Sequence, residues 1–294
     1  MDVFKTRVGT VESIMITPES YMAATELRRP YAVQHADGRY SFYAVCPLCD
    51  NPISIVGLFK SQEGSRYRRP FGKHHPGDVQ GLCAYDEDAY MNCPYANPSR
   101  KRRSRIRPPK NPTSLAIWRH MRDEFDHVAH AWETWSGIHL GPKLAGSALQ
   151  RWRANKVWNY YGATYRNLPQ MLFYGAPAQN LVKTYVVRSS PLRDALDSLP
   201  EVRLAPTPSP RYEQVDKTGT GFLSLDFHLT PGRSPRDGHH FTETFRLRVI
   251  CEGREAFPDL ELETDPQWLN HARRDMGGRR DRRLLDLARN VLDG

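Results

Sequence analysis

The chain has 294 residues and a formal net charge of +9, with 39% hydrophobic and 26% charged side chains. This length exceeds the usual size of one domain, so we expect two compact units. No apolar run reaches the roughly 20 residues that cross a bilayer, and MDVFKTRVGTVES lacks the pattern of a secretory signal. These features exclude a membrane-spanning protein and favour a cytoplasmic one.

The first 45 residues predict a strand, a helix and a hairpin. The segment IMIT is typical of a short strand, and a helix should follow it with Thr17 as the N-cap and Pro18 at the first helical position. Residues 31–45 alternate in polarity around Asp37-Gly38, which is a turn signal. The second strand of this hairpin runs directly into Cys46.

Two of the five cysteines, Cys46 and Cys49, form a CPLC knuckle. In a cytosolic chain this pattern favours metal or redox chemistry over a disulfide framework. A redox C-x-x-C usually opens a helix, whereas a strand-like segment beginning at Pro52 follows here. Thiolates aimed at one point suit zinc, which takes four ligands in a tetrahedron.

The third and fourth ligands should come from His74, His75, Cys83 and Cys93. Cys93 precedes a proline as Cys46 does, whereas Cys83 lies in an apolar context where a free thiol packs readily. The two histidines lie in a turn bounded by Gly and Pro. We therefore predict a closed, structural Zn²⁺ site, with His75 or Cys83 as substitutes, formed by Cys46, Cys49, His74 and Cys93.

Residues 40–97 resemble a group of uncharacterised bacterial proteins with a CPxC…GKH…CPY zinc-site segment. The matching stretches are CPLCDNPISIVGL, PFGKHHPGDVQGL and NCPYA. The resemblance implies that the first histidine of the pair and the CPY cysteine belong to the site, which are His74 and Cys93. It implies no activity.

A basic strip follows this segment. Residues 100–110 carry seven basic and no acidic side chains, whereas residues 1–99 and 181–294 are close to neutral. Residues 98–113 are also rich in proline, so we expect a basic linker or arm. Such a strip suits the phosphates of DNA or RNA. The predicted phosphate contacts are Arg100, Lys101, Arg102, Arg103, Arg105 and Arg107.

Helices should occupy residues 114–162. Apolar side chains recur at spacings of three and four from Trp118 to Trp135, and Gly137 suits the end of that helix. A second helix is expected over 143–161, where Arg151, Arg153 and Lys156 lie among Trp152, Trp158, Tyr160 and Tyr161. This mixture fits single-stranded nucleic acid or RNA, although aromatic side chains are more often core.

The remaining third predicts strands and then short helices. FLSLDFHLT and FTETFRLRVIC alternate with period two across a polar loop, which is typical of an antiparallel hairpin. The predicted fold class is therefore α+β. A zinc-ribbon-like domain spans 1–97, a basic arm 98–113 and an α+β body 114–294, with helices at 114–162, a β-hairpin region at 181–252 and C-terminal helices at 265–292.

Two other groups of histidines could bind a metal. His120, Asp123, His127 and His130 lie off the Trp face of their helix, where a solvated surface with local ion pairs is the commoner outcome. A loop holds Asp237, His239, His240 and Glu243, near His228. GKHHPGD resembles the His-bearing turn of HNH nucleases, without the helix residues that would complete that motif.

The sequence thus predicts a nucleic-acid-binding zinc protein without catalytic residues, acting as a subunit of a larger protein complex. One alternative is a metal-dependent nuclease that uses His74 and His75 or the His239 and His240 loop. Another is a protein-interaction module, because the regions on both sides of the basic strip are close to neutral.

Overall fold

The computed structural model describes residues 1–10, 13–60, 69–96, 105–233, 235–237 and 240–294. Their contacts divide the chain into two compact units. Unit 1 contains residues 1–120, 158–166 and 235–242. Unit 2 contains residues 121–157, 167–234 and 243–294. Each unit therefore combines segments that are distant in the sequence.

Unit 1 is built from short strands and two short helices. Its elements are β1 (Val3–Phe4), β2 (Ile14–Met15), α1 (Pro18–Thr25), β3 (Ala32–Gln34), β4 (Tyr40–Val45), β5 (Pro52–Val56), β6 (Phe71–His74), α2 (Glu87–Asn92), β12 (Arg236–Asp237) and β13 (His240–Phe241). A longer helix, α3 (Pro112–Asp123), begins among the residues of unit 1 and ends among those of unit 2.

Helix α1 begins as its sequence predicts. Thr17 is the N-cap, with its hydroxyl accepting from the Ser20 backbone N–H, and Pro18 is the first helical residue. The helix ends at Glu26, which takes a left-handed conformation. Tyr21 is the buried anchor of this helix, and its hydroxyl lies 2.8 and 2.7 Å from the carbonyl oxygens of Tyr31 and Tyr43.

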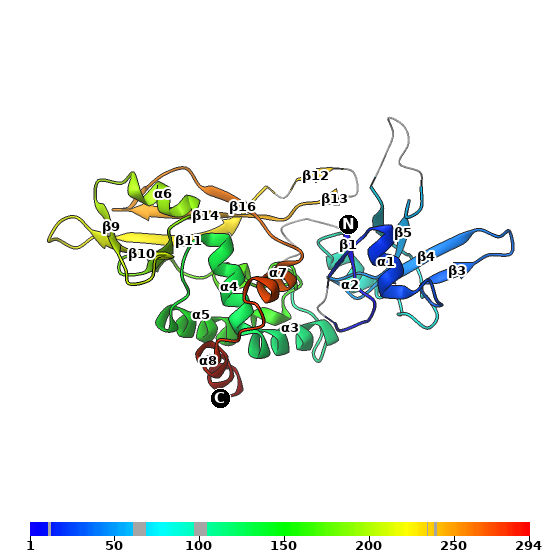
Figure 1. Ribbon diagram of the computed structural model, residues 1–294. Helices are drawn as coiled ribbons and strands as arrows, with labels where there is room; N and C mark the ends of the chain where they lie inside the picture. The colour runs from blue at the N-terminus through cyan, green and yellow to red at the C-terminus, as the bar shows by residue number, and fades with distance from the viewer. Residues whose placement is uncertain (11–12, 61–68, 97–104, 234, 238–239) are drawn as a thin grey trace. The chain divides into compact units, whose positions relative to one another are not determined.

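The strands β3, β4, β5 and β6 form an antiparallel sheet in that order. Figure 1 labels the first three of these strands. The predicted hairpin around Asp37-Gly38 joins β3 to β4. Ala44 and Ile53 are partners in the sheet, and both are fully buried on the face that α1 covers. Gly72 of β6 lies on the same face, where an added Cβ would meet Ile53 at 2.9 Å. This face carries the core of unit 1.

Unit 2 combines helices with two antiparallel sheets. Its elements are α4 (Phe125–Ser136), α5 (Pro142–Ala154), β7 (Gln179–Asn180), β8 (Tyr185–Val187), α6 (Pro191–Asp197), β9 (Val202–Pro206), β10 (Tyr212–Lys217), β11 (Leu225–Pro231), β14 (Thr244–Cys251), β15 (Arg254–Glu255), β16 (Leu260–Glu263), α7 (Trp268–Asp275) and α8 (Arg282–Asp293). A 3-10 turn lies at Gln170–Leu172, and another, Val157–Asn159, begins in unit 2 and ends among the residues of unit 1. The mixed α and β composition confirms the predicted fold class in its coarse form.

The predicted hairpin of the C-terminal third is present as β11 and β14. Leu225 pairs with Cys251, Phe227 with Val249 and Leu229 with Leu247, so one face of the hairpin is apolar. All six side chains are buried. The indole ring of Trp132 on α4 packs 6.2 Å from the ring of Phe227, which joins helix and sheet in one core.

Two helix predictions are wrong in their extent. The periodic segment from Trp118 to Trp135 is two helices, because Glu124 leaves the helical conformation between α3 and α4. The second predicted helix ends at Ala154 and not at residue 161, because Lys156 takes a positive φ of 47°. The end at Gly137 is confirmed, with φ 77°.

Candidate metal centre

The knuckle between β4 and β5 holds the first two cysteines. The backbone N–H of Cys46 donates to the Asn51 carbonyl at 2.8 Å, and that of Asp50 donates to the Cys46 carbonyl at 3.1 Å. Asp50 takes a left-handed conformation with φ 62°, which turns the chain back into β5. This tight turn brings both thiols to its inner side, where Cys46 and Cys49 are buried.

The other two side chains come from β6 and from the end of α2. His74 is the last residue of β6 and pairs with Ile53, four residues after Cys49. Cys93 is the C-cap of α2 and is buried. Sheet register and a helix end therefore bring together residues separated by up to 47 positions in the chain.

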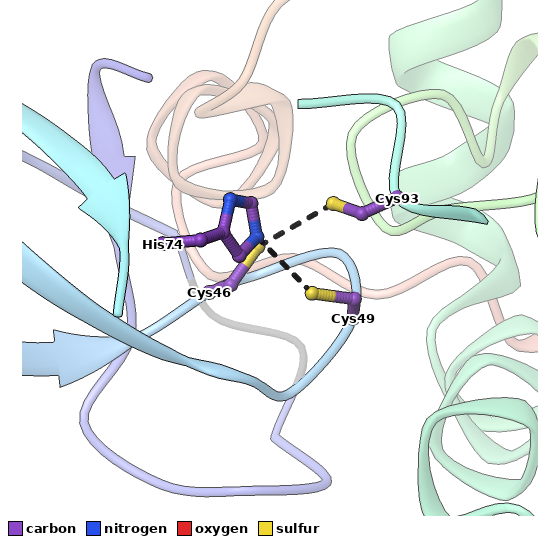
Figure 2. Close-up of side chains that lie close together, drawn as sticks. All are labelled: Cys46, Cys49, His74 and Cys93. Atoms are coloured by element: carbon purple, nitrogen blue, oxygen red, sulfur yellow. Dashed lines mark hydrogen bonds between the residues drawn. The ribbon is translucent and has the colours of Figure 1, made fainter. Parts of the chain in front are cut away.

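The four side chains converge on one point (Figure 2). One ligand atom from each lies within 4.8 Å of the others. The sulfur atoms of Cys46 and Cys93 are 3.8 Å apart, and the Cys49 sulfur lies 3.3 Å from Nε2 of His74. The three thiols are buried and the imidazole is half-buried. This Cys3His group is closed and can hold a metal ion.

Burial and neighbouring charges shift the pKa values of all four side chains of the group. Burial raises the pKa of the Cys49 and Cys93 thiols. Burial acts in the same sense on Cys46, but hydrogen bonds from Cys49 and Cys93 and the charge of His74 hold its pKa well below the usual value. Burial lowers the pKa of His74, but the nearby Cys46 and Cys93 outweigh it and raise that pKa to about 10. Without a metal, the group therefore pairs a Cys46 thiolate with a protonated His74, and burial keeps the other two thiols protonated.

Asn51 supports the site from outside the ligand set. Its side-chain N–H donates to the Cys49 sulfur at 3.4 Å and to the Asp86 carbonyl at 2.9 Å. Its side-chain oxygen accepts from the Asp86 backbone N–H at 2.6 Å. Asp86 is the N-cap of α2, whose other end carries Cys93. Asn51 therefore links the knuckle to the helix, and its place directly after CPLCD was the only sequence signal for it.

A buried ion pair fixes the turn of the knuckle. Lys5, which is 1% exposed, places its ammonium 2.5 Å from the Asp50 carboxylate. The same ammonium donates to the Thr10 carbonyl at 2.8 Å, and the Gly9 N–H donates to Asp50 at 3.0 Å. The Thr113 hydroxyl also hydrogen-bonds Asp50. Asp50, the residue of the knuckle with positive φ, is thus held from two segments, residues 5–9 and Thr113.

The two substitute ligands lie outside the group. The ring of His75 packs at 5.2 Å against Tyr43, and its Nδ1 lies 3.5 Å from the Ser54 hydroxyl. Cys83 is half-buried in a turn closed by its pairing with Val79. Burial, followed by the nearby Asp50 charge, raises the pKa of Cys83 to about 12. The structure therefore brings His74 and Cys93 to the knuckle, and not His75 or Cys83.

The predicted phosphate contacts divide into three groups. Arg100, Lys101, Arg102 and Arg103 lie outside the described residues. Arg105 is exposed, and its guanidinium donates to the Asn92 side chain at 3.4 Å. Arg107 is a correction, because it is only 3% exposed and donates to the carbonyls of Trp158 and Ala163 at 3.0 and 2.7 Å. Burial lowers the pKa of Arg107 to about 10, and this side chain is a core residue of unit 1.

The basic residues in and just after α5 are more accessible than Trp152, which lies between the two arginines. Arg153 and Lys156 are exposed, and Arg151 is half-buried with its guanidinium donating to Gln179 at 2.9 Å. Trp152 is 1% exposed. The aromatic side chain between the two arginines is therefore core and offers no stacking surface. Tyr161, in unit 1, is buried as well.

The predicted solvated row of helix histidines is wrong, because His120 and His127 are buried. Glu124, Asp126 and His127 do come together. However, Nδ1 of His127 lies 2.6 Å from Glu124, and the Arg280 guanidinium donates to Asp126 at 2.7 and 2.9 Å. An arginine already neutralises these carboxylates, so this is an ion-pair cluster of unit 2.

The loop that would serve a nuclease gathers no metal-binding group among the described residues. His239 lies outside those residues. His240 hydrogen-bonds Asp2 within unit 1. Glu243 is buried in unit 2 and accepts from Asn167 at 3.1 Å.

The chain shows no match to known protein families, to curated proteins or to solved structures. In the parts of the chain that the structure describes, no helix is long and apolar enough to span a bilayer. The site geometry is therefore the main basis for a functional conclusion.

Proposed function

We propose that the protein binds nucleic acid and that a structural zinc ion at Cys46, Cys49, His74 and Cys93 folds the unit bearing its basic arm. The convergence of these four ligand atoms carries the metal part of the proposal. Tetrahedral zinc with Zn–S bonds of about 2.3 Å has S···S edges of about 3.8 Å. The separation of the Cys46 and Cys93 sulfur atoms equals this value.

Zinc suits this donor set better than other common ions. Three thiolates and one imidazole are the ligands of structural zinc sites, whereas calcium and magnesium take oxygen ligands. All four positions are filled by protein, so no coordination site is left for substrate or water. The zinc unit then resembles a zinc ribbon in layout, with a knuckle between two strands and the last ligand after a short helix.

Nucleic acid is the partner that the charge distribution favours. Residues 100–110 contain seven of the 42 basic side chains and no acidic one. Several cations close together can neutralise neighbouring phosphates, and the release of their counterions increases the binding affinity. Arg105 is the first residue of this basic segment that the structure describes, and it is exposed. A non-catalytic subunit of a larger complex fits these features.

The nuclease alternative has no comparable support. It needs open metal coordination or accessible histidines. His74 lies in the closed group and His240 hydrogen-bonds Asp2. Metal-dependent cleavage that is lost in His74→Ala or His240→Ala variants would restore that alternative.

The test is a charge-neutralised arm. A variant with Arg100, Lys101, Arg102, Arg103 and Arg105 changed to Gln should lose most of its affinity for DNA and RNA at low salt. The slope of log K against log salt should flatten by about 0.9 for each duplex phosphate that the arm no longer neutralises. Arg107 stays intact because it is core.

The matched control removes the same number of positive charges elsewhere in unit 1. It changes Arg7, Arg28, Arg29, Lys60 and Arg119 to Gln, all of which are exposed. This variant should bind nearly as wild type. Equal binding by the arm variant and the wild type would overturn the proposal.

A further inference from the structure

The four-stranded sheet of unit 1 has a second face, opposite the core face that α1 covers. Side chains alternate along strands, so Tyr43, Ser54 and Lys73 lie on the face opposite Ala44, Ile53 and Gly72. These three side chains form a row across the sheet, because Tyr43 pairs with Ser54 and Ser54 pairs with Lys73 in the strand register. Lys73 is exposed, and Tyr43 and Ser54 are half-buried.

Side-chain contacts extend this row to both edges of the sheet. At the β6 edge, the His75 ring meets Tyr43 edge-on at 5.2 Å and 76°, and its Nδ1 lies 3.5 Å from the Ser54 hydroxyl. At the β3 edge, Nε2 of His35 lies 2.7 Å from the Ser41 hydroxyl. This face therefore carries an aromatic and polar row from His35 beside β3 to His75 beside β6, next to the apolar Val33 and Val56.

The charge of this face is positive. The strands β3, β4, β5 and β6 contain no Asp or Glu among their residues. Lys73 is exposed within β6, and Arg69 is exposed just before it. The turn between β3 and β4 adds Asp37, whose carboxylate is held by Arg39 at 2.6 Å. A polyanion approaching the face therefore meets cations without competing free carboxylates on these strands.

We propose that this face binds single-stranded nucleic acid, with a base stacked on Tyr43 and the backbone phosphate against Lys73. The proposal rests on the nucleic-acid binding inferred above and assigns that activity a second surface. A ring in the middle of an open antiparallel sheet can stack only on a base that is not already stacked within a duplex. The arm contacts phosphates alone, so it should bind single and double strands alike.

The experiment compares a labelled oligothymidylate with a duplex of equal length, by fluorescence anisotropy at about 50 mM salt, where phosphate contacts are strong. Tyr43→Ala should weaken binding of the single strand about tenfold, since base stacking is lost, and leave duplex binding unchanged. Lys73→Glu, at an exposed position, should weaken single-strand binding without affecting the fold. Tyr40→Ala is the matched control, because Tyr40 is exposed on the same strand and faces the other side.

One zinc ion per chain in each variant would show that unit 1 remains folded. If Tyr43→Ala and Lys73→Glu both bind oligothymidylate as the wild type does, the sheet proposal is overturned. Duplex binding that still depends on the arm would then leave the proposed function standing. If the wild type binds neither nucleic acid, both proposals fail together.

Discussion

Asn51 supports the ligand set, although it is not itself one of the four ligands. The Asn51 side-chain amide hydrogen-bonds the Cys49 sulfur and both the carbonyl and the N–H of Asp86. Asn51 is fully buried. Hydrogen bonds to ligating atoms orient them and tune metal affinity. No other residue type of this size offers two donors and an acceptor in one plane at this position.

Asn51→Ala should therefore reduce zinc affinity by about 10- to 100-fold. It should also lower the free energy of unfolding by about 1–3 kcal/mol, because the Asp86 groups lose their partner. Competition with a chromophoric chelator measures the affinity. Gln80→Ala, at an exposed position in the same unit, is the control. Equal zinc affinity in Asn51→Ala and the control would show that this amide does not support the site.

Glu133 makes unit 2 sensitive to acid. Its buried carboxylate accepts from His139 Nδ1 at 2.6 Å and from the Tyr212 hydroxyl at 2.9 Å, and it lies 2.6 Å from the Arg211 guanidinium. Burial acts to raise the pKa of Glu133, but the His139 hydrogen bond and the Arg211 charge outweigh it and lower that pKa.

A lowered carboxylate pKa contributes stability that is present above the unfolded value of about 4.3 and is lost as the pH falls below it. Urea unfolding of unit 2 should therefore require less denaturant as the pH drops through that window. Glu133→Gln should show a shallower pH dependence over the same range. Parallel pH profiles for the two proteins would contradict this role of Glu133.

The glycines at the end of α4 and in the middle of α5 differ in whether a side chain would fit in their place. Gly137 has φ 77°, and an added Cβ would clash with the Ser190 hydroxyl oxygen. Gly146 lies within α5, where a Cβ would meet Leu287 at an ordinary 3.6 Å. The same substitution should therefore have opposite effects at the two positions.

Gly137→Ala should lower the free energy of unfolding by more than about 1 kcal/mol, because the left-handed conformation and the close approach of Ser190 both resist a side chain. Gly146→Ala should raise it by about 0.4–1 kcal/mol, because the unfolded chain loses entropy. Denaturant titration of both variants measures the difference. A stabilising Gly137→Ala would show that the terminus of α4 is not as described.

Local signals predicted the elements well where they were strong. The Thr17-Pro18 helix start, the Asp37-Gly38 turn and the β11–β14 alternation depend on neighbouring residues, and all three are present. The burial of Arg107 depends on carbonyls more than 50 residues away, so its charge alone suggested an exposed side chain. The break at Glu124 is invisible to periodicity, because the apolar spacing continues across it.

The whole molecule consists of two units with discontinuous sequences. Residues 158–166 and 235–242 belong to unit 1, although they are far from the knuckle along the chain. Chain length suggested two units. It could not show that residues 158–166 and 235–242 belong to unit 1, because that depends on tertiary packing. The choice of Cys93 as the fourth ligand, by contrast, needed only a local signal, because Cys93 precedes a proline as Cys46 does.

Removing zinc should affect the two units differently. Only unit 1 contains the Cys3His group, and structural zinc contributes directly to folding free energy. Amide hydrogen exchange after chelation should accelerate in β4 and β5 and stay slow in β11 and β14. Metal-dependent protection in β11 and β14, or unchanged protection in β4 and β5, would contradict a zinc-dependent unit 1.

The most direct test of the zinc site is X-ray absorption at the zinc edge of the purified protein. We expect one zinc per chain, with three sulfur ligands at about 2.3 Å and one nitrogen ligand at about 2.0 Å. His74→Ala should remove the nitrogen ligand, whereas His75→Ala should leave the spectrum unchanged. A protein purified without zinc that also fails to take it up, or a bound ion with mainly oxygen ligands, would contradict the Cys3His assignment.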